Sequence, residues 1–200
     1  MYWRSSGHFW AFLGHLLLPE LHNLKLDGLE NPGSAASADP LISFLAASTH
    51  LETISICSST FSKSCLTTFL CGLPPTICRL DIFENRERHP WVGAVLDDDD
   101  VLATLELRPD SSTVCPALLE LVISPFNAIS DEALFRVITS RMPTLRRVDV
   151  AFDREMEVDI LPRLQSFVES GAQISITYPT VPLGYFSPWI GLPDRPLGSS

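Results

Sequence analysis

Three histidines recur at seven-residue intervals near the N-terminus, and imidazole is a common ligand of metal ions. They are His8, His15 and His22. Pro19 separates His22 from any helix that could carry the other two, and a seven-residue interval does not bring imidazoles to one metal ion. The four consecutive aspartates at 97–100 lack the alternating ligands and central glycine of a calcium-binding loop. The sequence therefore predicts no metal site, and the aspartates are interpreted as the solvent-exposed start of a helix.

The sequence contains no residue pattern typical of an enzyme. It has no G-x-S-x-G motif, no Cys–His signature and no glycine-rich loop that could hold a phosphate. Asp149 and Asp153 could in principle form a pair of catalytic carboxylates, but they are interpreted as surface residues because nothing in the sequence places them in one cleft. We therefore expect a non-enzymatic protein without a cofactor.

Composition and charge narrow the classes of partner. The chain has 200 residues, of which 46% are hydrophobic, as expected for one folded domain. It carries 14 Lys and Arg against 24 Asp and Glu, and the resulting net charge of −10 disfavours nucleic acid, which requires a basic surface. The apolar stretch at 9–18 is shorter than the roughly 20 residues that cross a bilayer. We therefore expect a protein partner and neither a nucleic acid nor a membrane.

The cysteines indicate a reducing compartment. Their number, five, is odd, and no two form a C-x-x-C pair of the kind that holds zinc. A chain of this length can also bury a core without disulfide bonds. We therefore expect a cytoplasmic or nuclear protein.

A short apolar pattern recurs six times along the chain. Four copies read P-x-L-x-x-L-x-L, with other aliphatic residues in place of some leucines: PELHNLKL at 19–26, PTICRLDI at 75–82, PALLELVI at 116–123 and PTLRRVDV at 143–150. Two copies lack the proline, LETISI at 51–56 and GAQISI at 171–176. Successive copies start 26, 27, 30 or 41 residues apart, and insertions at 31–37 and 84–96 account for the two longer steps. Each copy predicts a short strand.

Apolar residues at helical spacing lie between these strands. The segment 101–107 could form another strand, but it begins too close to the copy at 116–123 to leave room for a helix between them. It is therefore interpreted as a helix whose inward residues are Val101, Leu102 and Leu105. Ser62 and Ser130 are placed to cap the helices that follow them.

One strand and one helix cannot bury an apolar face alone, so the repeats must stack on one another. The sequence thus predicts an α/β solenoid of about six irregular repeats, with a short parallel sheet on the concave side and helices on the convex side. We expect an amphipathic helix at 1–18 that caps one end, the repeats at 19–178, and a proline-rich tail at 179–200.

The concave side of the sheet is the candidate binding site, because side chains alternate between the two faces of a strand. The predicted binding residues on it are Arg79, Asp81, Phe83, Glu120, Val122, Arg147 and Asp149. Arg79 and Arg147 flank Glu120 in neighbouring repeats, which fits either an internal ladder of ion pairs or a protein-docking surface. Trp91, in the loop at 85–92, is a further candidate that either anchors an interface or folds back over the helices.

The pattern resembles the leucine-rich repeat. The copy I-x-x-L-x-I-x-x-N at 77–85 matches the family motif LxxLxLxxN through its asparagine. The corresponding asparagine positions of other copies hold Leu29, Ser59 and Asp153. The resemblance is therefore to irregular leucine-rich repeats, such as those of fungal F-box proteins, and it covers about residues 16–178.

The segments 115–141 and 145–178 look like the closing repeats of such F-box proteins. In that family the F-box binds the Skp adaptor of a cullin ubiquitin ligase, and the repeats hold the target protein. The resemblance implies a right-handed solenoid that recognises a ligase substrate. Only about one helix fits before Leu21, so we expect no F-box here and a Skp-type adaptor only if an F-box lies upstream. The alternatives are a structural remnant or scaffold without a ligase role, and an enzyme built on an unrelated α/β sheet.

Overall fold

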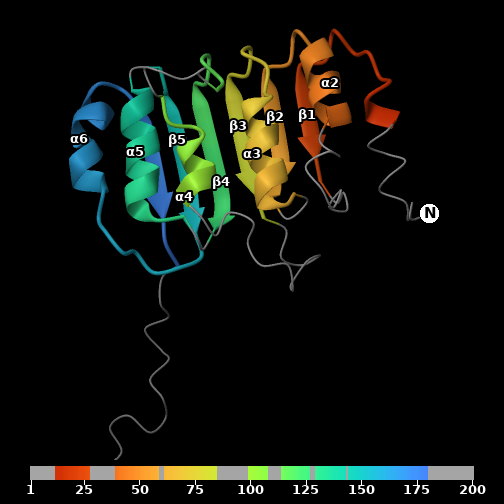
Figure 1. Ribbon diagram of the computed structural model, residues 1–200. Coiled ribbons are helices and arrows are strands. Elements are labelled where there is room, and N and C mark those ends of the chain that lie inside the picture. Colours follow the sequence, from red (N-terminus) through yellow and green to blue (C-terminus); the bar gives the residue numbers. More distant parts are fainter. Residues whose placement is uncertain are drawn as a thin grey trace, which may run out of the picture.

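Strands and helices alternate along the chain (Figure 1). The computed structural model describes residues 12–27, 39–58, 61–84, 99–107, 114–126, 129–142 and 144–179. The strands in this part are β1 (Asn23–Leu26), β2 (Thr53–Cys57), β3 (Arg79–Phe83), β4 (Glu120–Phe126), β5 (Arg147–Phe152) and β6 (Gln173–Thr177). The helices are α2 (Asp39–Ala47), α3 (Lys63–Cys71), α4 (Asp99–Ala103), α5 (Asp131–Arg141) and α6 (Leu161–Glu169).

The strands form one parallel six-stranded sheet in the order β1-β2-β3-β4-β5-β6. Parallel neighbours require a crossover connection between them, and a helix lies in each of these connections. The same position of the repeated pattern is paired all across the sheet, through Leu24, Ile54, Leu80, Leu121, Val148 and Ile174. The predicted α/β class, the strand positions and the alternation of strands with helices are therefore confirmed.

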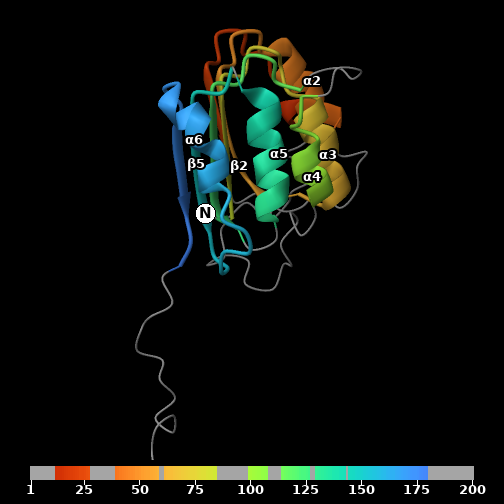
Figure 2. The same cartoon turned by 90° about the vertical axis from the view of Figure 1, so that its left-hand side faces the viewer.

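The core lies between the sheet and the helices. Figure 2 shows α2 to α5 on one side of the strands, and Leu164 of α6 belongs to the same buried cluster. The strand residues that face this layer are at most 1% exposed in the four central strands: Ile54, Ile56, Leu80, Ile82, Leu121, Ile123, Val148 and Val150. Each such side chain contributes about 1.5–3 kcal/mol on burial, so this layer holds the sheet in one register.

The two predicted helix caps are present. The Ser62 hydroxyl accepts a hydrogen bond from the backbone amide of Cys65 at 3.3 Å, at the start of α3. The Ser130 hydroxyl accepts one from the amide of Ala133 at 3.1 Å, at the start of α5. Each bond satisfies an amide that has no partner within its own helix.

The segment predicted as the helix at 101–107 begins earlier and is shorter, since α4 spans Asp99–Ala103. Its predicted inward residues are at most 1% exposed: Val101, Leu102 and Leu105. The aspartate run begins a helix as expected, since Asp99 and Asp100 are the first residues of α4. Asp100 is exposed and Asp99 is half-buried. The Asp99 carboxylate accepts hydrogen bonds from the amide and the hydroxyl of Ser130, at 3.0 and 2.7 Å. The packing of α4 beside α5 produces this contact, which links the two helix starts.

Near the N-terminus, residues 12 and 13 are helical and the chain turns at residues 14 and 15. Leu13 is 5% exposed and contacts the core, as a capping segment would. The predicted helix does not continue to residue 18, because the chain turns at Gly14, a poor helix former, and residues 16–18 have no regular structure. Residues 1–11, the insertions at 31–37 and 85–96 and the tail at 180–200 lie outside the described residues. None of the described helices combines the length and the apolar character needed to cross a membrane.

Candidate protein-binding face

The side of the sheet away from α2 to α5 forms a continuous polar surface, which we call the open face. Strand register aligns its side chains in rows across the sheet. All of its members are half-buried or exposed: Asn23, Lys25, Thr53, Ser55, Arg79, Asp81, Phe83, Glu120, Val122, Ser124, Arg147, Asp149, Ala151, Gln173, Ser175 and Thr177. The structure thus brings together, on one face, every predicted binding residue except Trp91, which lies outside the described residues.

The first row contains the two arginines that were predicted to flank Glu120. Glu120 pairs in register with Arg79 on one side and Arg147 on the other. Its carboxylate accepts a hydrogen bond from the Arg79 guanidinium at 3.1 Å. Arg147 instead contacts Asp149 of its own strand at 3.3 Å. The ladder of ion pairs is therefore interrupted at β5, because Glu120 pairs with Arg79 while Arg147 pairs with Asp149.

These charged side chains remain largely accessible to water. The exposed fractions are 42% for Arg79 and 36% for Glu120, and 46% for Arg147 and 42% for Asp149. Exposed pairs of this kind contribute about 0–1 kcal/mol to folding, because water solvates the separated charges almost as well. The fold therefore depends little on them, and a partner could replace either contact.

The second row places an apolar side chain between two carboxylates. Asp81 accepts a hydrogen bond from the Ser55 hydroxyl at 3.0 Å. Val122 lies in register between Asp81 and Asp149. Val122 therefore offers a small apolar contact area, and the two carboxylates beside it offer polar contacts of the kind found at interface rims.

The third row begins at Cys57, which is only 1% exposed although the alternation of side chains along β2 would place it on the open face. Cys57 pairs in register with Phe83. The ammonium group of Lys25 lies 5.0 Å from the centre of the Phe83 ring. Since β1 and β3 lie on either side of β2, this cation–π contact passes over β2.

No protein-family model matches the sequence, and no curated protein matches it either. The functional interpretation therefore starts from the residues of this chain.

A buried polar cluster that no sequence motif indicates lies around Asp131, the first residue of α5. The side chain of Asp131 is 0% exposed and that of Arg154 is 13% exposed, with 2.6 Å between their nearest charged atoms. The Asp131 carboxylate also accepts hydrogen bonds from the amides of Glu157 and Val158, both at 2.8 Å, and from the Tyr178 hydroxyl at 3.0 Å. It thus joins α5 to the segments that follow β5 and β6.

The contacts of Asp131 determine its ionisation. Burial alone would raise its pKa, but the hydrogen bonds from Arg154, from the two amides and from Tyr178 outweigh burial and hold the pKa below its usual value. The pKa of Tyr178 is raised, first by burial and then by its bond to the Asp131 carboxylate. Asp131 is therefore ionised at neutral pH and satisfied by its neighbours, which makes it a structural group.

A second buried charge, Arg141 at the end of α5, is also 0% exposed. Its guanidinium donates hydrogen bonds to the carbonyls of Leu105, Val114 and Cys115. Those carbonyls lie on both sides of the segment 108–113 that follows the α4 region. Arg141 therefore holds the segment before β4 against the end of α5. Burial raises the pKa of the nearby Cys115 thiol to about 12, so this thiol is protonated at neutral pH.

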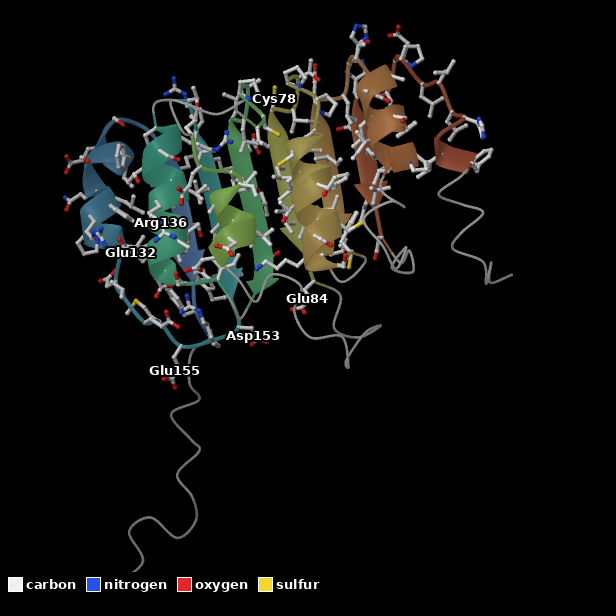
Figure 3. All side chains as sticks on the ribbon, viewed as in Figure 1. Cys78, Glu84, Glu132, Arg136, Asp153 and Glu155 are labelled. Atoms are coloured by element: carbon white, nitrogen blue, oxygen red, sulfur yellow. The ribbon has the colours of Figure 1, made fainter. Side chains whose placement is uncertain are left out.

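Asp149 and Asp153, which were interpreted as surface residues and not as a catalytic pair, lie on different parts of the surface. Asp149 lies on the open face in β5, whereas Asp153 follows β5 at the edge of the sheet where the strands end, near Glu155 (Figure 3). Cys78 lies at the opposite edge, where the strands begin (Figure 3).

One group of metal-ligating side chains is found in the described part of the chain. Glu20, His22 and His50 each place one ligand atom within 4.8 Å of those of the other two, and all three residues are exposed. His22 therefore lies beside a histidine of the next repeat. Alignment of the repeats could have found this group, because Glu20 and His50 both precede the first aliphatic residue of their copies, Leu21 and Leu51.

Proposed function

We propose that the chain is a non-enzymatic protein-interaction domain whose open face binds a protein partner. The observation that carries this proposal is that one side of the sheet contributes the core, while the other presents accessible arginines, carboxylates and an apolar centre in register. Interfaces are commonly built from such a mixed surface, with Arg and aromatic side chains contributing most of the binding energy.

The finer architecture we propose is a right-handed solenoid of irregular leucine-rich repeats. Parallel order of all six strands, one helix in each connection and helices α2 to α5 on one face support this interpretation. Strand–helix–strand crossovers of parallel sheets are right-handed in nearly all proteins. On this proposal the open face is the inner, concave surface of the solenoid.

A matched pair of double variants tests the binding face. Arg79→Ala with Arg147→Ala removes two arginines from the open face, whose side chains are 42% and 46% exposed. Arg136→Ala with Arg163→Ala removes two from the helix side, which are 46% and 43% exposed; Arg136 is labelled on α5 in Figure 3. The four arginines are equally accessible, so the two variants differ mainly in the side of the sheet that loses charge.

The measurement is affinity capture with the wild-type chain, followed by titration of the purified partner against each variant. We expect the open-face variant to bind at least about tenfold more weakly, as for arginines at interface centres. The helix-side variant should bind like the wild type. Loss of binding in the helix-side variant alone, or retention in both, would contradict the proposal.

We further propose that this binding is the substrate recognition of a cullin-type ubiquitin ligase, as the resemblance to fungal F-box proteins implies. The experiment is to repeat the capture and to probe for a Skp-type adaptor and cullin subunits. Their recovery together with the target supports ligase membership. A target that is captured reproducibly without them indicates a scaffold, and no reproducible partner indicates a structural remnant.

A further inference from the structure

Glu20, His22 and His50 lie together because they occupy corresponding positions in the first two copies of the repeated pattern. Leu21 and Leu51 occupy the same position in the first two copies of the pattern. Leu51 is 0% exposed and Leu21 packs against the core. The residues before and after each leucine therefore point outward at the edge where the strands begin, and in these two copies they are histidines and glutamates.

The backbone fixes these residues side by side. The amides of Glu52 and Thr53 both donate hydrogen bonds to the carbonyl of His22, at 3.0 Å each. The following residues begin β1 and β2, where Asn23 pairs in register with Thr53. The spacing between the two pairs of side chains is thus set by the parallel sheet.

The side chains form a two-by-two array in which imidazoles and carboxylates alternate. Glu20 Oε2 lies 3.5 Å from His50 Nδ1, and Glu52 Oε1 lies 3.8 Å from His22 Nδ1. The two imidazole rings stack with their centres 5.9 Å apart. Both histidines consequently have a nitrogen close to a carboxylate, and both face the same patch of solvent.

Imidazole nitrogen and carboxylate oxygen are ligands that zinc accepts at about 2.0–2.2 Å in tetrahedral geometry. Two such ligands on one ion are roughly 3.4 Å apart, whereas the ligand atoms of Glu20, His22 and His50 lie within 4.8 Å. Rotation of exposed side chains can close this difference, since Glu20 is 82% exposed, His22 52% and His50 54%. Calcium and magnesium prefer sites made only of oxygen, so the two imidazoles select a zinc-type ion.

We propose that Glu20, His22 and His50 bind one divalent transition-metal ion of the zinc class, with Glu52 or water available for the fourth position. The ion would join the first two repeats at their exposed edge. Later copies carry other residues at the same two positions: Thr76 and Cys78, Ala117 and Leu119, Thr144 and Arg146, and Ser170 and Ala172. The site therefore belongs to the N-terminal end of the sheet and is separate from the open face.

The test is a calorimetric titration of the full chain with Zn²⁺ after treatment with a chelator. We expect one ion per chain in the wild type. His22→Ala and His50→Ala should each weaken binding at least about tenfold, Glu20→Gln should weaken it less, and the double histidine variant should show no binding at this site. Because these side chains are exposed, all variants should retain the melting temperature of the wild type in chelator.

Two control variants make the assignment specific. His15→Ala removes another exposed histidine, and Cys78→Ser removes a thiol at the same edge of the sheet. Both should bind Zn²⁺ like the wild type. Zn²⁺ should also raise the melting temperature of the wild type but not of the double histidine variant, because an ion that binds only the folded state stabilises it. Absence of binding by the wild type, unchanged binding by the double histidine variant, or loss of binding in either control would overturn the proposal.

Discussion

Two arginine–carboxylate pairs, one on the helix side of the sheet and one on the open face, differ in how far water reaches them. Arg154 and Asp131 pair in the helix layer, with 13% and 0% of their side chains exposed. Arg79 and Glu120 pair on the open face, with 42% and 36% exposed. The buried pair is completed by further hydrogen bonds from two amides and a tyrosine. The open pair has a single short contact between its charged atoms.

This difference separates charges that hold the fold from charges available to a partner. A buried carboxylate without partners is costly, so Asp131 is stable only because each of its contacts is made within the chain. An accessible carboxylate such as Glu120 exchanges one partner for another, or for water, at little cost. Burial therefore assigns the two pairs different roles although their chemistry is the same.

The largest expected effect comes from placing one new charge on either side of the same strand. Leu121→Lys puts an ammonium group at a position with 0% exposure, and its desolvation together with the lost packing of Leu121 should cost an amount comparable with the typical domain stability of about 5–15 kcal/mol. Val122→Lys puts the same group on the open face between Asp81 and Asp149. Circular dichroism with thermal melting should find Leu121→Lys unfolded and Val122→Lys folded. Similar melting of the two variants would show that the faces are not distinct.

A smaller loss is expected when the buried pair is broken. Asp131→Ala leaves Arg154 without its main partner, and removal of one member of a buried pair costs about 3–5 kcal/mol. Urea unfolding would measure this loss. Glu132→Ala is the matched control, because it removes the next carboxylate of α5, which pairs with Arg163 at 2.7 Å on the surface. Equal losses in the two variants would contradict the distinction between buried and exposed pairs.

The pH dependence of the free energy of unfolding in acid should reflect the buried pair of Asp131 and Arg154. The native pKa of Asp131 lies below its unfolded value of 3.8, so the unfolded chain binds the proton more readily. The contribution of Asp131 to the free energy of unfolding is therefore fully present above pH 3.8 and is lost as the pH falls through the lower native pKa. In Asp131→Asn the free energy of unfolding should change less over this range. An unchanged acid dependence would show that Asp131 is not the titrating group.

The smallest effect on folding is expected for the open face. Arg79→Ala should lower the free energy of unfolding by about 0–1 kcal/mol, because the pair with Glu120 is exposed. A double-mutant cycle with Glu120→Ala in urea would measure the coupling between the two side chains. A coupling as large as the effect of Asp131→Ala would mean that the open face is itself a structural element.

The composition of the open face was predictable because it depends on local periodicity. Residues two apart on a strand share a face, so knowing that Leu121 and Ile123 are inward also places Glu120 and Val122 outward. Ser62 and Ser130 were predictable as caps for a similar reason, since a cap bonds an amide only three residues away.

Contacts between side chains distant in sequence were not predictable in this way. The cation–π contact between Lys25 and Phe83 joins two strands that are not neighbours in the sheet, and the bond from Ser130 to Asp99 depends on how α5 packs beside α4. His22 is spaced regularly with His8 and His15 in the sequence, but its neighbour in space is His50 of the next repeat.

The sequence by itself determined which residues form strands, which side chains face the core and which serines begin helices. Those properties follow from interactions within a few residues of the chain. Only the tertiary structure decided which charges are paired and which are buried, because Asp131 obtains its partners from residues 23 to 47 positions further along. Residues so far apart in sequence meet only because the repeats stack on one another. The register of that stacking determines the partners of each polar group, and no single segment encodes it.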